Sequence, residues 1–332
     1  MIKVSSMFLR ARRLFTATLA SLVLAVPTGA AAADAAAYPS RPVRLVVPFA
    51  PGSATDTMAR LFAQELSQRL GQSVVVEDKP GAFGQLAAVH AAKSAPDGYT
   101  LLMTSNTTHS ANPHLYKSLP YDPIKDFEPI VRTATLPFML VVNPSLPVKT
   151  TAELLAYVRA RPDAVTFASA SSTSLIAAES INTLAKVRMV HVPYKSSPQA
   201  ILDVASGQVQ VMVADFATAM PHVQSGRVRI LGVTTSNRSA LVPGAPPIAD
   251  TIKGFDVTSW NGIFAPAGTP KPILARLSRD SLEILGRREV VSKLAAIGYE
   301  VDALPPEPFT QYLRAQLDYW GKLIRDAGIK PE

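Results

Sequence analysis

The sequence predicts an α/β protein of two similar lobes, each a mostly parallel sheet with helices on both faces. Strands alternate with helices along the chain after residue 38, which favours parallel sheets. A region rich in proline interrupts the alternation, which then resumes. Each half also contains a buried strand that turns through a polar loop into a helix. Because open α/β sheets bind ligands beyond the carboxyl ends of their strands, we expect a ligand cleft between the lobes.

The first half has the pattern βαβαβ. The apolar run Val43–Phe49 predicts a buried strand, and Thr55–Leu70 places Met58, Phe62 and Leu66 on one helical face. Gly71 supplies the helix stop. The next predicted elements are a strand at Ser73–Glu77, a helix from Gly84 to about Lys93 and a strand at Tyr99–Thr104.

A connecting region at about 112–129 is followed by a strand at Phe138–Asn143 and by a helix from Thr150 or Thr151 to about Arg161. The second half then predicts strands at Val165–Ala168, Val187–Pro193, Val209–Ala214 and Val228–Thr234, and helices at Leu175–Lys186, Pro198–Ser206 and Phe216–Ser225. The remainder predicts a strand at Gly262–Pro266, two or three helices between Pro270 and Ile297, and a last helix at Pro308–Ala327. We therefore assign 38–139 and 230–332 to lobe 1 and 140–229 to lobe 2.

Residues 1–37 have the composition of a signal peptide followed by an alanine-rich leader. Basic residues, among them Arg12 and Arg13, precede the apolar run Leu14–Val26, which is short for a spanning helix of about 20 residues. The stretch Ala30–Ala37 offers cleavage sites, for instance at Ala33. We expect a cleaved signal and a periplasmic protein; an uncleaved anchor is the alternative.

Composition narrows the function classes. The net charge of +8 falls to about +4 without the leader, and no Lys/Arg run follows it, so a nucleic-acid partner is not expected. The chain has no cysteine, which excludes disulfides, thiol nucleophiles and cysteine-ligated metals. The mild positive balance suits a small organic anion without requiring one.

The familiar catalytic and cofactor motifs are absent. The sequence contains no G-x-S-x-G, S-x-x-K, phosphate-binding loop, dinucleotide fingerprint or H-E-x-x-H. We therefore expect neither catalysis nor a cofactor. His109 and His114 have a spacing that is not diagnostic of a metal, and ordinary polar positions are the favoured interpretation.

The first candidate site is the loop at 48–56, which joins the first strand to its helix. Free backbone N–H groups at such a helix start favour an anion. The candidate ligand-binding residues here are Phe49, Ser53, Ala54, Thr55 and Asp56. Two alternatives stay open: Asp56 caps the helix or fixes the loop, and Ser53 and Thr55 merely start the helix.

The second candidate loop, at 169–174, precedes a helix of the other lobe and contributes Ser171, Thr173 and Ser174. It is either a pocket lined with donors or a flexible loop. Asp215 follows an apolar strand and either accepts from an ammonium group or caps the helix from Phe216, with capping favoured. Together the two loops predict a clamp around a carboxylate.

Two further candidates lie outside these loops. Tyr194, with Lys195 beside it, is placed at the mouth of the cleft, although Lys195 is equally well explained as an exposed charge. Phe83 lies in the turn before the second helix.

A series of short motifs resembles the substrate-binding proteins of tripartite tricarboxylate transporters, the Bug receptors. These motifs are YPSRPV from Tyr38, PFAPGSATD from Pro48, KPGAFG from Lys79, PDGYTLL from Pro96, LPYDP from Leu119, HVPYK from His191, GQV from Gly207 and FAPAGTP from Phe264. The resemblance implies a two-lobed, hinged periplasmic binding protein that closes on a small carboxylate. It also implies transporter permease subunits as partners and two loops, at 48–56 and 169–174, that hold the ligand.

The chain departs from the family pattern at several glycines. Ser53, Phe83 and Ser196 stand where the family usually has glycine, and Leu175 or Ile176 lies near the position of a usual histidine. Replacing glycine narrows close approach of the backbone, and Phe83 adds aromatic surface. We therefore hypothesise a ligand with an apolar or aromatic part rather than a compact polycarboxylate.

We accordingly expect a monomeric receptor with its hinge near Thr135–Val142 and Arg229–Thr235. The alternative is a sensor of the same fold that presents its ligand to a signalling partner.

Overall fold

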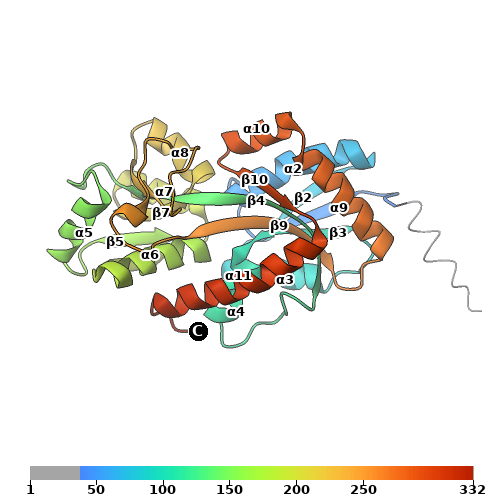
Figure 1. Cartoon of the computed structure of the whole chain (residues 1–332), viewed down its shortest axis with the longest axis horizontal. Coiled ribbons are helices and arrows are strands. Elements are labelled where there is room, and N and C mark those ends of the chain that lie inside the picture. The colour runs from blue at the N-terminus through green and yellow to red at the C-terminus, as the bar shows by residue number, and fades with distance from the viewer. Residues whose placement is uncertain (1–37, 332) are drawn as a thin grey trace, which may run out of the picture. The chain divides into compact units, whose positions relative to one another are not determined.

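The computed structural model describes residues 38–331, so the predicted signal peptide at 1–37 lies outside the described residues. From Pro39 onward the residues belong to one unit. Within it, the elements of the first half gather at one end and those of the second half at the other, with β4 and β9 between them (Figure 1). This arrangement is the predicted two-lobed α/β fold, whereas the lobe boundaries near 140 and 229 stay a prediction.

The first sheet has the strand order β2-β1-β3-β9-β4, and β10 pairs with β4 from the other side. Its strands are β1 (Val43–Val47), β2 (Val74–Asp78), β3 (Thr100–Ser105), β4 (Phe127–Val142), β9 (Thr258–Pro266) and β10 (Glu300–Leu304). Pairing is parallel among β2, β1 and β3 and antiparallel where β9, β4 and β10 join.

The second sheet has the order β4-β7-β5-β6, with β8 also paired to β4. Its other strands are β5 (Thr166–Ser169), β6 (Val190–Pro193), β7 (Val211–Asp215) and β8 (Arg229–Val233). Parallel pairing again joins the strands of the βαβ units, β5 with β6 and with β7. Both sheets are therefore mixed rather than mostly parallel, because the strands that return between the lobes run against the others.

Strand β4 is longer than predicted and belongs to both sheets. Its first part pairs with β9 up to Pro137, and its last part, from Phe138, pairs with β7 and β8. The sequence predicted a connecting region at about 112–129 and a strand only from Phe138, and Pro129 and Pro137 within β4 disfavour a regular ladder. The register shifts beside Pro129 and again between Arg132 and Ala134, so irregular pairing accommodates residues that a regular ladder disfavours.

The helices of eight or more residues lie within a few residues of the predicted ranges, whereas the four-residue α4 falls in the predicted connecting region. The helices are α2 (Ala54–Leu70), α3 (Gln85–Ala92), α4 (Asn112–Leu115), α5 (Thr151–Arg159), α6 (Ser172–Ala185), α7 (Ser197–Ser206), α8 (Phe216–Gln224), α9 (Lys271–Leu285), α10 (Arg288–Ala296) and α11 (Pro306–Asp326). Short helical turns η1 (Ala82–Gly84), η2 (Thr107–Ala111) and η3 (Ile248–Asp250) complete the described chain. The π-helical turn η2 and the strand β10 had no counterpart in the sequence analysis.

The long helix α11 covers the central strands of the first sheet (Figure 1). Phe309 and Leu313 on this helix join a buried cluster with Trp260 and Phe264 of β9. Gly262 makes this approach possible, since a Cβ atom there would lie 2.4 Å from Cζ of Phe309. Past the end of α11, the carbonyl of Ala327 accepts a hydrogen bond from Thr183 Oγ1 of α6 at 3.1 Å.

Two chain segments that pass between the sheets are bonded to each other. The backbone N–H of Thr234 donates to the carbonyl of Phe138 at 2.9 Å, and the N–H of Phe138 donates to Thr234 Oγ1 at 3.0 Å. Both residues lie in the segments in which the sequence analysis placed the hinge. A hinge at this point stays a prediction.

Candidate functional site

Four helices begin around one small pocket, which we call the polar pocket. Each has a side chain as N-cap: Ser53 for α2, Ser171 for α6, Ser196 for α7 and Asp215 for α8. A capping side chain satisfies one N–H of the first turn and leaves others without an intrahelical acceptor. The partial positive charges of several helix starts therefore converge on the same region.

The polar pocket brings together seven of the eleven predicted residues. Phe49, Ser53, Ala54 and Thr55 line it from the first loop, and Ser171, Thr173 and Asp215 line it from the second lobe. Its volume is about 30 Å³, enough for about two water molecules. No lysine, arginine or histidine lines this pocket, whereas the carboxyl of Asp215 does, so the donors that it offers are backbone N–H, hydroxyl and amide groups.

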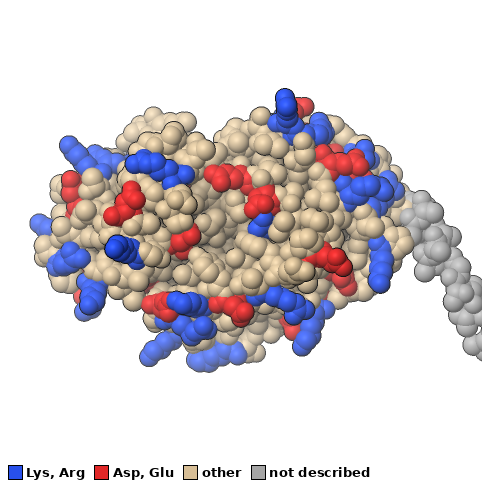
Figure 2. Space-filling model, viewed as in Figure 1, with Lys and Arg blue, Asp and Glu red and all other residues tan. Residues whose placement is uncertain are grey.

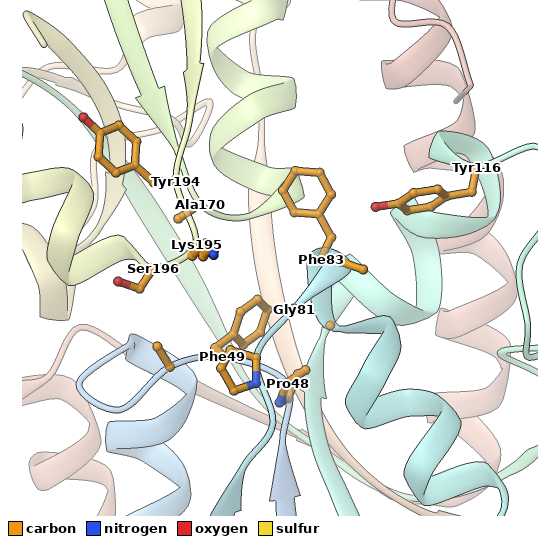
Figure 3. Close-up of a pocket in the computed structure, with 13 residues that line it drawn as sticks. Pro48, Phe49, Gly81, Phe83, Tyr116, Ala170, Tyr194, Lys195 and Ser196 are labelled. Atoms are coloured by element: carbon orange, nitrogen blue, oxygen red, sulfur yellow. The ribbon is translucent and has the colours of Figure 1, made fainter.

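A wider pocket of about 390 Å³, which we call the aromatic pocket, adjoins the polar pocket. Phe49 lines both, and the neighbours Ala170–Ser171 and Ser196–Ser197 each place one residue in each pocket. Figure 3 shows Phe83 between Tyr116 and Ala170, with Phe49 nearby. Tyr194 also lines this pocket, and its hydroxyl donates to Asp203 Oδ2 at 2.7 Å, away from the aromatic rings.

Asp56 and Ser174, the two remaining predicted residues, line neither pocket. Asp56 accepts from the N–H of Gly52 at 2.7 Å and pairs with Arg60 Nε at 2.7 Å, so it fixes the shape of the first loop. Ser174 donates to the carbonyl of Val213 at 2.5 Å and so attaches α6 to β7. These contacts correspond to the structural alternatives for both residues.

Asp215 is the N-cap of α8, with its side chain almost fully buried. Its Oδ1 accepts from the N–H of Thr218 at 2.8 Å, and its Oδ2 accepts from Thr218 Oγ1 at 3.0 Å. Burial raises the pKa of the Asp215 carboxyl above its ordinary value. The geometry is that of the favoured capping interpretation, and contact with an ammonium group stays a prediction.

Further polar residues of the pocket region were not among the predicted ones, including Asn106, Thr107, Ser259 and Asn261. Asn106 and Thr107 follow β3 at the carboxyl edge of the first sheet, where ligands are expected. Asn261 is a polar residue within the apolar strand β9; its Nδ2 donates to Thr55 Oγ1 at 3.1 Å. A buried amide in such a strand was the available signal.

Direct hydrogen bonds join the two lobes beside the polar pocket. Ser172 Oγ donates to Thr107 Oγ1 at 2.9 Å, and Asn106 Nδ2 donates to Thr173 Oγ1 at 2.9 Å. All four side chains are buried. We call this set of contacts the hydroxyl bridge; it holds the first turn of α6 against the end of β3.

His109 and His114 have different partners. His109 is stacked on Phe264, with ring centroids 4.0 Å apart, and burial lowers its pKa to about 3, so the ring is neutral. His114 Nε2 lies 2.9 Å from the carbonyl of Leu317. Within residues 38–331, no group of three or more His, Asp or Glu side chains has the geometry to hold a metal ion.

The sequence of residues 58–329 matches the model of the tripartite tricarboxylate transporter family receptor. This chain belongs to that receptor family. The match confirms the resemblance seen in the sequence motifs. The receptor is 34% identical to the protein BugT of Bordetella pertussis, over 95% of this chain and 98% of BugT.

Two solved relatives share the receptor's fold over their whole length. The R. palustris protein Rpa4515, solved with adipate, is 35% identical, with a TM-score of 0.87 over 89% of this chain and 100% of its own. MatC from Rhodopseudomonas palustris, solved with bound malate, is 34% identical, with a TM-score of 0.79 over 86% and 100% of the two chains.

The described part of the receptor contains no helix with the length and apolar character that a membrane span requires. On the face viewed in Figure 2, lysines and arginines are interspersed with aspartates and glutamates.

Proposed function

We propose that the receptor captures a small carboxylate in the periplasm by hinged closure and delivers it to the permease subunits of a tripartite transporter. The observation that carries this proposal is the convergence of four helix N-termini on the polar pocket. Backbone N–H groups and helix dipoles bind a carboxylate oxygen without a basic side chain.

Two relatives support the choice of ligand class. Rpa4515 was solved with adipate and MatC with malate, and both are about one third identical to the receptor. Adipate and malate are small carboxylates of different shape. A shared anion site with variable surroundings accounts for both.

Hinged closure is supported by the fact that the two candidate ligand loops belong to different lobes. Ser53 and Thr55 belong to the first lobe, whereas Ser171 and Thr173 belong to the second, and all four line the polar pocket. A ligand that bonds both sets stabilises the closed form over the open one. Strand β4, which continues from one sheet into the other, is the natural place for the bend.

The receptor family is a family of binding proteins, and we propose that this member is not an enzyme and needs no cofactor. Periplasmic location follows from the family and from the predicted signal at 1–37. The second candidate is a sensor that presents the same ligand to a signalling partner. The two functions share one binding site and differ only in what recognises the closed form.

The test is calorimetric titration of the ligand-free protein with mono-, di- and tricarboxylates, amino acids and uncharged amides of the same acids. We expect carboxylates to bind, with a free energy of about −8 kcal/mol for micromolar affinity, and the amides to fail. A folded, ligand-free receptor that binds no carboxylate contradicts the proposal. Uptake of the bound acid is then measured in cells that lack the receptor. Loss of uptake indicates transport, and unchanged uptake indicates sensing.

A further inference from the structure

We infer that the receptor's ligand is a monocarboxylate with a ring-bearing apolar body, and that Phe83 is a specificity-determining residue. The carboxylate occupies the polar pocket and the body occupies the aromatic pocket. This inference rests on the proposed function, because it divides the ligand of that same site into a head and a body.

The polar pocket has room for one small head group. Its volume is about 30 Å³, and two of its lining residues, Thr107 and Thr173, are held in place by the hydroxyl bridge to Ser172 and Asn106. A branched di- or tricarboxylate needs several anion sites within a few ångströms. In this pocket the hydroxyl groups of Thr107 and Thr173 lie where further carboxylate groups of such a ligand would have to bind.

A second observation in the polar pocket indicates a bound ligand there. Asn261 is fully buried and lines the pocket, and one end of its side-chain amide donates to Thr55 Oγ1. The other end, Oδ1, has no hydrogen-bond partner among the described residues. Oδ1 is an acceptor and cannot bond a carboxylate, but with the amide flipped Thr55 Oγ1 donates to Oδ1 and the free Nδ2 donates to the head group.

The aromatic pocket offers the opposite environment. Its rings are those of Phe49, Phe83, Tyr116 and Tyr194, each partly exposed, and prolines and alanines make up much of the remaining wall. Lys195 is the one charged residue that lines it, and this side chain is exposed. The volume of about 390 Å³ lies within the usual range for small-molecule sites, about 300–1,000 Å³.

The backbone holds Phe83 in its position at some energetic cost. Phe83 has φ 45° and ψ 42°, and the preceding Ala82 has φ 47°. Residues with a Cβ atom rarely adopt this left-handed conformation, and such strain clusters at functional sites. The carbonyl of Phe83 accepts from Asn112 Nδ2 at 3.0 Å, and Gly84 packs so closely on Pro48 that a Cβ atom would lie 2.7 Å away.

The division of the site therefore points to a head and a body of different character. A single carboxylate accepts from the free N–H groups of the helix starts. A planar apolar body covers the rings of Phe49 and Phe83, which gain from ring–ring packing beyond simple burial.

The test compares phenylacetate and benzoate with malate and citrate by calorimetric titration of the ligand-free receptor. We expect the aromatic monocarboxylates to bind at least about tenfold more tightly. Tighter binding of malate or citrate overturns the inference but leaves the proposed function intact. Failure of all four acids to bind overturns both.

The variant Phe83→Gly tests the residue itself. We expect its affinity for phenylacetate to fall by about tenfold, whereas its unfolding temperature without ligand does not fall, because glycine adopts the left-handed conformation without strain. The control is Tyr157→Ala, which removes a ring of α5 that packs on Arg161, outside both pockets. Unchanged phenylacetate affinity in Phe83→Gly overturns the role of this residue.

Discussion

At the residue scale, the side chains of the candidate site serve either the pocket or the loops that shape it. Ser53 and Ser171 do both, since each lines the polar pocket while capping a helix. Asp56 serves only the loop, through Gly52 and Arg60. The sequence pattern alone does not distinguish these roles, because a short polar side chain at a helix start suits both.

We predict that Asp215 contributes to stability through its cap and is not required for binding a simple carboxylate. Asp215→Ala removes the bonds to Thr218 and lowers the free energy of unfolding by about 1–2 kcal/mol, as measured by urea denaturation. The affinity for phenylacetate does not fall, because a negative charge leaves the neighbourhood of the ligand's carboxylate.

The matched control for Asp215→Ala is Thr150→Ala, which removes the cap of α5, where Thr150 Oγ1 accepts from the N–H of Glu153 at 3.1 Å. It is expected to lower stability by a similar amount, about 1 kcal/mol, with no effect on binding. Loss of phenylacetate binding in Asp215→Ala alone contradicts the capping interpretation.

At the scale of the elements, ion pairs and close packing hold the loops of the site in place. Arg60 of α2 pairs with Asp56 on its own helix and with Asp78 at the end of β2, at 2.7 Å in each case. The first loop and the turn that carries Phe83 are therefore attached to one guanidinium group. Burial, together with the nearby charge of Asp56, raises the pKa of Asp78 to about 6.

We predict a pH dependence of stability that originates at Asp78. A raised pKa means that the folded protein binds the proton more tightly than the unfolded chain, so this group's stabilising contribution is lost as the pH rises from about 4 to about 6. Asp78→Asn lacks this loss. Relative to the wild type, the variant's free energy of unfolding therefore increases between pH 4 and pH 7.

Urea denaturation of both proteins at several pH values measures this difference. Carboxyls with lowered pKa values, such as Glu77 beside Lys79 and Asp122 beside Lys125, act in the opposite direction but are common to both proteins. A difference that is constant with pH contradicts the assignment to Asp78.

Helix α11 provides a packing prediction. Gly262→Ala forces a Cβ atom against the ring of Phe309, so we expect a loss of about 1–3 kcal/mol in the free energy of unfolding. Gly244→Ala is the control, since nothing lies within 4 Å of a Cβ atom there. Equal stability of the two variants by thermal unfolding refutes the close approach of α11 to β9.

At the scale of the whole described molecule, the two sheets share β4, and the hydroxyl bridge adds direct bonds between the lobes. The contact between Thr183 and Ala327 links α6 to the end of the chain. A closed arrangement is therefore stabilised partly by the protein and partly by whatever ligand bonds both lobes.

We predict that Ser172→Ala combined with Thr173→Val shifts the ligand-free receptor toward an open form. The substitutions remove the bonds to Thr107 and Asn106 without changing the capping residue Ser171. Small-angle X-ray scattering should show a larger radius of gyration for the variant than for the wild type, and a decrease when phenylacetate is added. An unchanged radius indicates that the bridge does not control closure.

The sequence by itself determined the alternating elements, the family and half of the residues that line the polar pocket. Local signals suffice for these features: apolar spacing sets the helix faces, and a polar turn after a buried strand marks the binding edge. The single strand β4 escaped prediction because its prolines indicate breaks, whereas bonds to β9 and to β7 hold the strand together across its irregularities.

Only the tertiary structure decided which polar residues line the pocket and which are bonded within the fold. Asp56 and Ser174 looked equivalent to Ser53 and Thr173 in the sequence. In the structure Asp56 is bonded to the N–H of Gly52 and to Arg60, and Ser174 donates to the carbonyl of Val213. Asn106, just after β3, and Asn261 of β9 come to the pocket region from positions far apart in the chain. A side chain's partner depends on what packs against it, and that packing involves residues that the local pattern does not contain.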